Sequence, residues 1–312
     1  MTGFVRTVTG DVDPVDLGRV NYHEHLFQVS PLLPGDDLDD EAASADEAAQ
    51  LRASGFETMV DATPLGLGRR PAAIRRISAS TGLRVVMTTG VHRREHYRSN
   101  HPLLQARPEE LAEAFVRDLT AGAVEPDEAA PEAMTARAGV LKAGLGYWRI
   151  DAAAGRTIEA IGAAHRATGA PVMVHLEHGT AAFEALEAFD GVGVAADQVA
   201  LAHMDRNPDP GLHAELAAAG AYLGYDGAAR AKDWPDSVLL DCLVATAEAG
   251  GASRILLGGD VARRTRYRAY GGLPGLRYLG ERFVPRLMVK AGADLTDAVL
   301  RRNPAMWLTW RR

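Results

Sequence analysis

Cysteine and lysine are almost absent from this chain of 312 residues. Cys242 is the only cysteine, so no disulfide can form within the chain, which fits a protein kept in a reducing compartment. Only three of the 34 basic residues are lysines, at positions 142, 232 and 290. Lysine is almost never fully buried unless it is paired, so a lysine inside an apolar segment of this chain needs a chemical reason.

Long apolar runs are also missing. No stretch approaches the length of a membrane span, and residues 1–14 contain no apolar signal region. The net charge is −7, and this acidic balance does not indicate nucleic acid or an acidic membrane surface as a partner. We therefore expect a cytoplasmic protein whose partners include neither nucleic acid nor membrane.

Short apolar segments alternate with helical segments along the chain. The expected strands cover residues 20–23, 58–61, 84–89, 139–142, 172–175, 198–203, 221–225 and 254–260. This alternation predicts a parallel sheet covered by helices, and eight units favour a closed (β/α)8 TIM barrel of the α/β class over an open sheet. No G-x-G-x-x-G motif follows the first of these strands, which counts against a dinucleotide-binding fold.

The domain organisation follows from the length. A barrel of this type needs about 250 residues, so we expect residues 1–312 to form a single domain with loop insertions. The surplus is assigned to lead-in strands over 1–18, turned at Gly10-Asp11, and to an insertion over 91–137. Helices over 280–290 and 295–301 are expected to close the domain.

Polar residues stand where the expected strands end. His23 and His25 are two positions apart, so in an extended strand both imidazoles face the same side, which makes half of a divalent-metal site. The fourth, fifth, sixth and eighth strands end at Lys142, His175, His203 and Asp260. Each of these alone has an ordinary explanation, such as a surface histidine or a helix-capping aspartate. All six are expected at the catalytic end of one barrel, which is harder to explain by chance.

These residues and their neighbours resemble the phosphotriesterase family of the amidohydrolase superfamily, over nearly the whole chain. The matching motifs are His23-Glu24-His25 after Gly18, Leu141-Lys142-Ala143, Val174-His175, Asp197-Gln198-Val199 leading to Ala202-His203, Leu256-Leu257-Gly258-Gly259-Asp260 and Asn303-Pro304-Ala305. The resemblance is closer to the lactonase-like branch, and it suggests a homodimer.

The resemblance implies two divalent metal ions, with zinc as the first expectation and manganese, cobalt or iron as alternatives. His23, His25 and Asp260 would hold the buried ion, and His175 and His203 the more exposed one. Lys142, N-carboxylated by CO₂, would bridge both. A cationic amine between two dications is repelled, so it must lose its proton. A metal-bridging hydroxide would be the nucleophile, and Asp260 would be catalytic by passing the proton to the leaving group.

The residues of the loops after the strands indicate the substrate class. Organophosphate-hydrolysing members carry an aspartate after the sixth strand and a histidine after the seventh, where this chain has Arg206 and Gly227. Residues 263–272 look like the branch that acts on lactones, including sugar lactones that bear a phosphate. Arginine binds phosphate or carboxylate in a bidentate manner. The expected substrate contacts are Tyr97, Arg206, Arg263, Arg266 and Tyr270.

The leading hypothesis is thus a binuclear metal-dependent hydrolase of lactones or carboxylic esters, phosphorylated sugar lactones among them. A phosphotriesterase acting on organophosphate triesters is one alternative. A metal-binding scaffold without catalysis is another, from a different class. Asp205 and Asp226 are either supports for the ligands or loop caps, and Tyr147-Trp148 is either a pocket wall or packing.

Overall fold

The computed structural model describes residues 3–124 and 136–311. Eight parallel strands form one sheet in the order β10-β9-β8-β7-β6-β5-β4-β3. Their bounds are β3 (Val20–Glu24), β4 (Thr58–Asp61), β5 (Arg84–Val91), β6 (Ala138–Leu145), β7 (Val172–Leu176), β8 (Val199–Ala202), β9 (Tyr222–Tyr225) and β10 (Ile255–Leu257). After β10, the Asp260 amide donates to the His23 carbonyl at 2.9 Å, which brings the two edges together. The predicted (β/α)8 barrel is confirmed, nearly closed.

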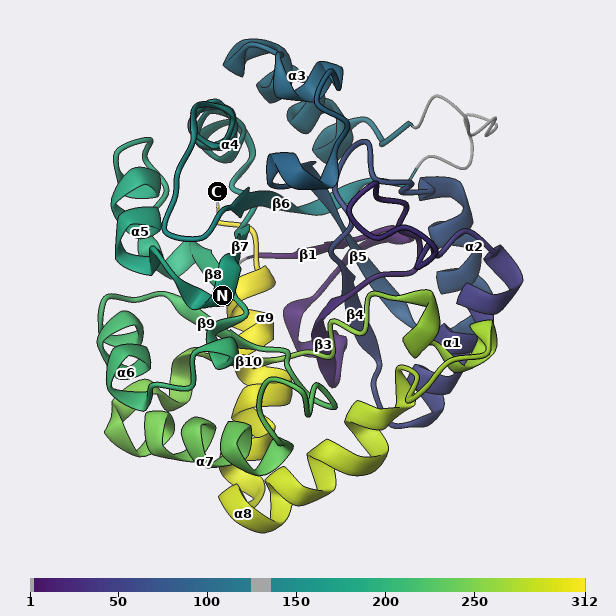
Figure 1. The fold of residues 1–312 in the computed structure, drawn as a ribbon, viewed down its shortest axis with the longest axis vertical. Helices are drawn as coiled ribbons and strands as arrows, with labels where there is room; N and C mark the ends of the chain where they lie inside the picture. Colours follow the sequence, from purple (N-terminus) through teal and green to yellow (C-terminus); the bar gives the residue numbers. More distant parts are fainter. Residues whose placement is uncertain (1–2, 125–135, 312) are drawn as a thin grey trace.

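Helices surround the strands (Figure 1). They are α1 (Glu41–Ala53), α2 (Pro71–Thr81), α3 (Pro108–Thr120), α4 (Ala152–Thr168), α5 (Ala182–Asp190), α6 (Pro210–Ala218), α7 (Asp236–Thr246), α8 (Val284–Asp297) and α9 (Asn303–Leu308). Helix α4 begins at Ala152 because the Asp151 side chain caps it by accepting from the Ala153 and Ala154 amides at 3.0 and 2.9 Å. Gly292, at φ 77°, interrupts α8 inside the gap expected between the two closing helices.

The barrel interior is apolar toward the amino ends of the strands. Each of the eight strands contributes at least one buried side chain to a single cluster: Val20, Val60, Val86, Val140, Met173, Ala200, Tyr222 and Leu256. Tyr22 also belongs to this cluster, and its ring has room because a side chain at Gly224 or Gly258 would collide with it. The interior is therefore a packed core and not a channel.

Polar residues follow the apolar ones on the same inner face. Successive side chains of a strand alternate between faces, so residues two or four positions further along also point inward. Val140 is followed in this way by Lys142, Met173 by His175, Tyr222 by Asp226, and Leu256 by Asp260. The strand period itself thus carries the polar groups to the carboxyl ends of the strands.

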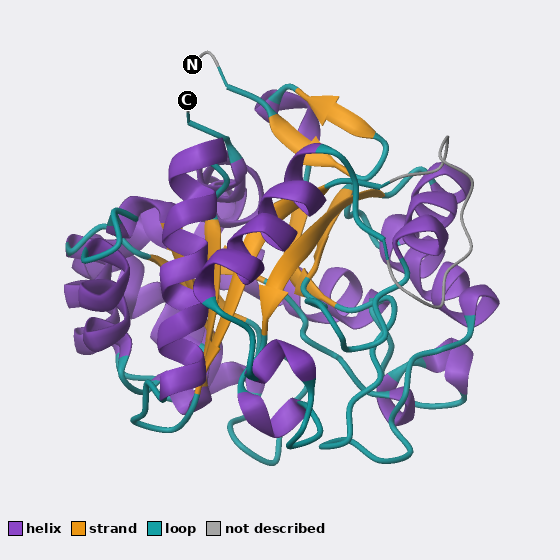
Figure 2. Cartoon of the chain, turned by 90° about the horizontal axis from the view of Figure 1, so that it is seen from above, coloured by secondary structure: helices purple, strands orange, loops and turns teal. Residues whose placement is uncertain are grey.

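The opposite end of the barrel is closed by the chain termini. Strands β1 (Val5–Thr7) and β2 (Gly10–Val12) form an antiparallel hairpin there, and the turn falls at residues 8–9 instead of the expected Gly10-Asp11. Val5, Leu17, Trp307 and Leu308 pack on the apolar cluster from this side. Figure 2 shows the hairpin and both ends of the chain at the same end of the molecule.

The described part of the expected insertion at 91–137 contains two short 3-10 turns, Arg94–His96 and Pro102–Leu104, and helix α3. Residues 125–135 of this insertion, and residues 1–2 of the expected lead-in, lie outside the described residues. Within 3–124 and 136–311, no helix is both long enough and apolar enough to cross a membrane.

Candidate metal centre

The six expected metal ligands lie together at the carboxyl end of the barrel. All of them line one cavity of about 380 Å³. The described residues around it are His23, His25, Gln28, Leu32, Leu33, His92, Arg93, His96, Lys142, His175, Glu177, His203, Arg206, Arg230, Asp260, Ala262 and Arg263. The predicted ligands are thus drawn from both edges and the middle of the sheet and meet in one place.

His23, His25 and Asp260 form the first ligand group. Asp260 Oδ1 lies 3.6 Å from His23 Nε2 and 3.5 Å from His25 Nε2. Ligand atoms stand about 2 Å from a zinc ion, which places atoms of different ligands about 3–4 Å apart. His25 Nδ1 donates to the Thr63 hydroxyl at 2.7 Å, which leaves its Nε2 free for a metal. The spacing and the free nitrogens fit a divalent ion.

His175 and His203 form the second group. His203 Nε2 lies 2.8 Å from His175 Nδ1, and His175 Nε2 is buried without a hydrogen-bond partner among the described residues. Burial, followed by the nearby Arg206 charge, lowers the pKa of His203 to about 3. Burial and the neighbouring His203 likewise lower the pKa of His175. Both rings are therefore neutral near pH 7, which is the form that binds metal.

Lys142 is buried and lines the same cavity as the two groups, with 1% of its surface exposed. Its Nζ donates to the Ala62 carbonyl at 2.6 Å. Burial lowers the pKa of this amine to about 8, although the Asp260 carboxylate opposes the shift. About a tenth of the side chain is thus uncharged at pH 7, far more than for an ordinary lysine, and only the uncharged amine is nucleophilic.

Asp226 connects the two ligand groups. It follows β9 and is completely buried. Its carboxylate accepts from His23 Nδ1 at 3.0 Å and from His203 Nδ1 at 2.7 Å, and it also contacts the Tyr22 hydroxyl. Carboxylates that bind the second nitrogen of a ligand histidine fix the tautomer and orientation of the ring. Asp226 therefore orients both imidazoles, which is the supporting role that the sequence offered for it as an alternative to loop capping.

Two arginines reach the Asp260 carboxylate. Arg206 Nη2 donates to Asp260 Oδ2 at 2.8 Å, and Arg230 contacts both the same oxygen and the Asp260 carbonyl. Burial would raise the pKa of Asp260, but Arg230 and His23 outweigh burial and hold that pKa well below its usual range. Sequence reasoning missed Arg230, because one arginine among 31 in the chain carries no signal by itself.

The other expected substrate contacts are distributed unevenly. Arg263 lines the cavity and pairs with Asp36 at 3.1 Å, and Arg266 is half-buried close to Arg230 and Arg263. The Tyr97 hydroxyl donates to the Leu65 carbonyl at 2.9 Å and accepts from the His92 amide. The Tyr270 hydroxyl is bound to Asp40 and Ser44 on the α1 side. Both tyrosine hydroxyls are thus engaged within the protein.

Backbone strain is concentrated around this cavity. Seven non-glycine residues of the described chain have a φ in the left-handed region, and all follow strands β6 to β10: Trp148, His178, Ala181, His203, Ala229, Asp260 and Ala262. Such residues cost about 1–3 kcal/mol each and gather at functional sites, where the surrounding structure holds them in place. His203 and Asp260 are themselves expected ligands.

Comparison with known proteins agrees with this geometry. The model of the phosphotriesterase family matches residues 3–308. A phospho-furanose lactonase of Mycoplasmopsis agalactiae is 31% identical over 317 residues, covering 96% of this chain and 90% of the relative. The crystal structure of a lactonase from Listeria monocytogenes superposes with a TM-score of 0.91 at 31% identity, over 99% of this chain and 100% of that one. A phosphotriesterase homology protein of Escherichia coli, solved with phosphate in its active site, is 26% identical with a TM-score of 0.83, over 95% of this chain and 99% of that one. The chain belongs to the phosphotriesterase family.

Proposed function

We propose that this protein hydrolyses lactones, phosphorylated sugar lactones among them, at a centre of two divalent metal ions. The observation that carries the proposal is the convergence of four histidines, Lys142 and Asp260 on one cavity. Relatives named phospho-furanose lactonases, about as long as this chain, support the substrate class.

The donor set suits two ions of the kind that hydrolytic enzymes use. His23, His25 and Asp260 would hold one ion, and His175 and His203 the other. Lys142 lines the same cavity, and its uncharged amine can attack CO₂, forming a nitrogen–carbon bond and losing a proton. The resulting anion replaces a cation by an oxygen donor that can contact both ions. Divalent ions in such a site polarise a carbonyl oxygen and lower the pKa of a bound water to about 7.

The protein's own residues then prepare the reaction. Asp226 orients the His23 and His203 rings through their Nδ1 atoms. Asp260 Oδ2 is placed to accept a proton and return it to the alkoxide that leaves when the lactone ring opens. Arg206 and Arg230, which touch this carboxylate, favour its charged form and so promote the return of the proton to the alkoxide.

The charge of the cavity favours an anionic substrate. Its described lining holds four arginines, Arg93, Arg206, Arg230 and Arg263, against the carboxylates of Glu177 and Asp260. Arginine presents a planar fork that matches phosphate and carboxylate. A phosphate on the sugar would therefore find cationic partners at the rim while the lactone carbonyl faces the histidines.

The test is an activity panel on protein loaded with Zn²⁺, Mn²⁺ or Co²⁺. We expect hydrolysis of aldonolactones, with higher kcat/KM for those bearing a phosphate. Absence of hydrolysis for every lactone and carboxylic ester would refute the proposal, and turnover of aryl phosphotriesters alone would favour the phosphotriesterase. A non-catalytic scaffold predicts that Lys142→Ala and Asp260→Asn leave any observed rate unchanged.

A further inference from the structure

The exposed tryptophans of this protein lie beside the metal centre. The chain has four tryptophans. Trp307 and Trp310 are buried at the far end of the barrel, whereas Trp148 is 63% and Trp234 is 42% exposed. The Trp234 Nε1 donates to the carbonyl of Arg206 at 3.2 Å, and Arg206 contacts Asp260. The two exposed tryptophans thus stand on the loops after β6 and β9, at the end of the barrel that holds the expected ligands.

Trp148 belongs to a second hollow at the barrel mouth, which we call the aromatic side pocket. It measures about 700 Å³ and is lined by Tyr147, Trp148, Glu177, His178, Thr180, Arg206 and Asn207. Glu177 and Arg206 also line the catalytic cavity. These two side chains therefore stand at the boundary between the two spaces, and a molecule that occupies both must contact them.

A tight backbone turn holds the side chains of Tyr147 and Trp148 at the pocket. Gly146 and Arg149 exchange hydrogen bonds of 3.2 Å, so that Tyr147 and Trp148 are the central residues of a tight turn. Asparagine and glycine are the usual residues at such positions. Trp148 nevertheless adopts φ 47°, and its amide donates to the Thr180 hydroxyl at 3.0 Å. The turn thus holds a strained, exposed tryptophan against the loop after β7, where no packing requires it.

The polar groups of the pocket suit a hydroxylated ring. Arg206 has a buried Nε that makes no hydrogen bond within the described residues. Glu177 is paired with Arg93 at 2.9 Å, and the amide of Asn207 and the imidazole of His178 complete the polar lining. Pockets for small molecules combine such a few polar groups with aromatic faces. A sugar ring can stack its C–H face on Trp148 or Tyr147 while its hydroxyls bond to the amide, carboxylate and guanidinium groups.

We infer that the aromatic side pocket binds a sugar ring attached to the lactone, so that preferred substrates are lactones of glycosylated aldonic acids. The lactone ring occupies the catalytic cavity, the second ring occupies the pocket, and Arg206 lies between them. This inference rests on the proposed function and narrows its substrate class.

Binding of stable hydroxy acids tests the pocket without relying on turnover. In a Trp234→Phe background, Trp148 is the only exposed tryptophan that the structure describes. Its fluorescence is titrated with gluconate, 6-phosphogluconate and lactobionate, which carries a second sugar ring. We expect lactobionate to bind about tenfold more tightly than gluconate, since one aromatic stacking contact corresponds to about that factor. Equal affinities, or a response to 6-phosphogluconate alone, would overturn the inference.

Kinetics provide the second arm. We expect kcat/KM for lactobionolactone to exceed that for gluconolactone by about tenfold, and the ratio to fall to about one in Trp148→Ala. Trp148→Asn, which places a turn-favouring residue at the strained position, is expected to fold at least as well and to lose the ratio equally. Phe183→Ala removes an aromatic residue that is 44% exposed outside the pocket and serves as the matched control.

The outcomes separate the two proposals. If both lactones are hydrolysed equally by the wild type, or if Trp148→Ala keeps the preference, the sugar-ring inference is wrong and the lactonase proposal stands. If neither lactone is hydrolysed, the wider panel of lactones and esters decides the lactonase proposal, while the difference between lactobionate and gluconate still decides what the pocket binds.

Discussion

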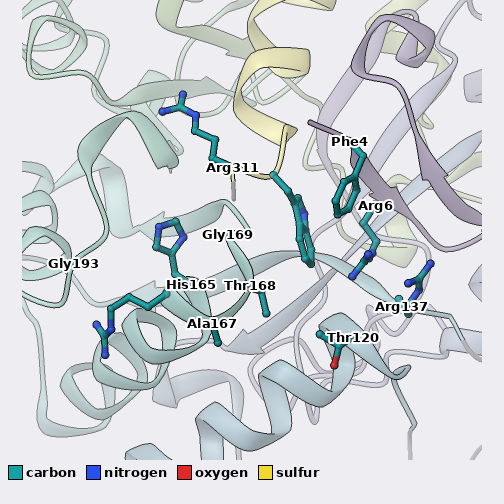
Figure 3. A pocket seen from close by; sticks show the side chains of 12 residues that line it. Phe4, Arg6, Thr120, Arg137, His165, Ala167, Thr168, Gly169, Gly193 and Arg311 are labelled. Atoms are coloured by element: carbon teal, nitrogen blue, oxygen red, sulfur yellow. The ribbon is translucent and has the colours of Figure 1, made fainter. Parts of the chain in front are cut away.

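The barrel has a hollow at each end, and only one of them has the features of a catalytic centre. The hollow at the amino ends of the strands is the larger, about 620 Å³ against about 380 Å³. It too is lined by arginines, a histidine and aromatic rings, with Arg6, Arg137, His165, Trp310 and Arg311 around it (Figure 3). Size and a cationic lining therefore do not distinguish the two.

What differs is how the polar groups are satisfied. At the amino end, Arg6 is held by both Asp11 oxygens at 2.8 and 2.7 Å, and Arg311 is paired with Asp197. His165 Nδ1 donates to the Ala170 carbonyl at 2.8 Å, and Trp310 Nε1 donates to Gly139. At the mouth, the histidines are oriented by neighbours but direct their remaining nitrogens at one another or at the cavity. Groups left for a ligand, together with strained backbone, distinguish a site from a structural hollow.

The largest expected effect is a loss of catalysis at the mouth of the barrel that leaves the far end intact. Lys142→Ala should lower kcat/KM for lactones by on the order of a thousandfold, because it removes the bridge between the two ligand groups. The thermal midpoint of the metal-free protein should change little, since the variant also removes a buried amine. Lys290→Ala, on exposed α8 and paired with Asp241, is the matched control and should keep wild-type kcat/KM. A fully active Lys142→Ala enzyme would contradict the assigned bridge.

The converse change destabilises the far end of the barrel and leaves catalysis at the mouth intact. Leu308→Ala creates a cavity in the apolar cluster and should lower the free energy of unfolding by about 2–5 kcal/mol. Below its melting range the variant should retain the kcat/KM of the wild type, because Leu308 is separated from the cavity by the apolar cluster. Urea unfolding measures the first quantity and lactone kinetics the second. A large loss of kcat/KM in the folded variant would show that the two ends are coupled.

Acid stability should depend on a histidine that the mouth does not use. Burial lowers the pKa of His213 to about 4, and its ring is bonded to Tyr225 and to the Met204 carbonyl. Its usual pKa is about 6.5, so the unfolded state takes up a proton first as the pH falls. The contribution of His213 to the free energy of unfolding is therefore complete above pH 6.5 and is reduced by about 3 kcal/mol as the pH drops to about 4. Urea unfolding of metal-free protein between pH 7 and pH 4 should show a shallower loss for His213→Gln than for the wild type; parallel losses would rule out this cause.

A smaller effect is expected when the carboxylate that orients the His23 and His203 rings is replaced. Asp226→Asn should weaken metal affinity and kcat/KM by about 10–100-fold, because a carboxamide orients the His23 and His203 rings less well. Asp197→Asn removes a carboxylate of the same kind at the far end and should leave both quantities unchanged. Competition with a chelating dye measures the affinity. Equal behaviour of the two variants would argue against an orienting role for Asp226.

Much of the architecture was predictable because the barrel obeys a simple period. Buried parallel strands read as continuous apolar segments, and the inner face recurs every second residue. Lys142, His175 and Asp260 could be placed at the mouth on that basis, and the structure brings them together with His23, His25 and His203.

The loops were less predictable for a physical reason. Their side chains have partners that are distant in the sequence, as Tyr270 has at Asp40 and Ser44, and Tyr97 at Leu65. Arg230 reaches Asp260 only because the loop after β9 folds across the mouth. Such long-range pairings follow from packing and not from local pattern, so abundant arginines could not be sorted into binding and structural ones.

The central claim is that the mouth is a two-metal centre that the far end of the barrel does not share. Metal content per chain, measured by elemental analysis after loading and removal of free ions, tests it most directly. The account predicts about two divalent ions in the wild type and fewer in Lys142→Ala. A wild-type value of one or less, or an unchanged value in Lys142→Ala, would contradict it.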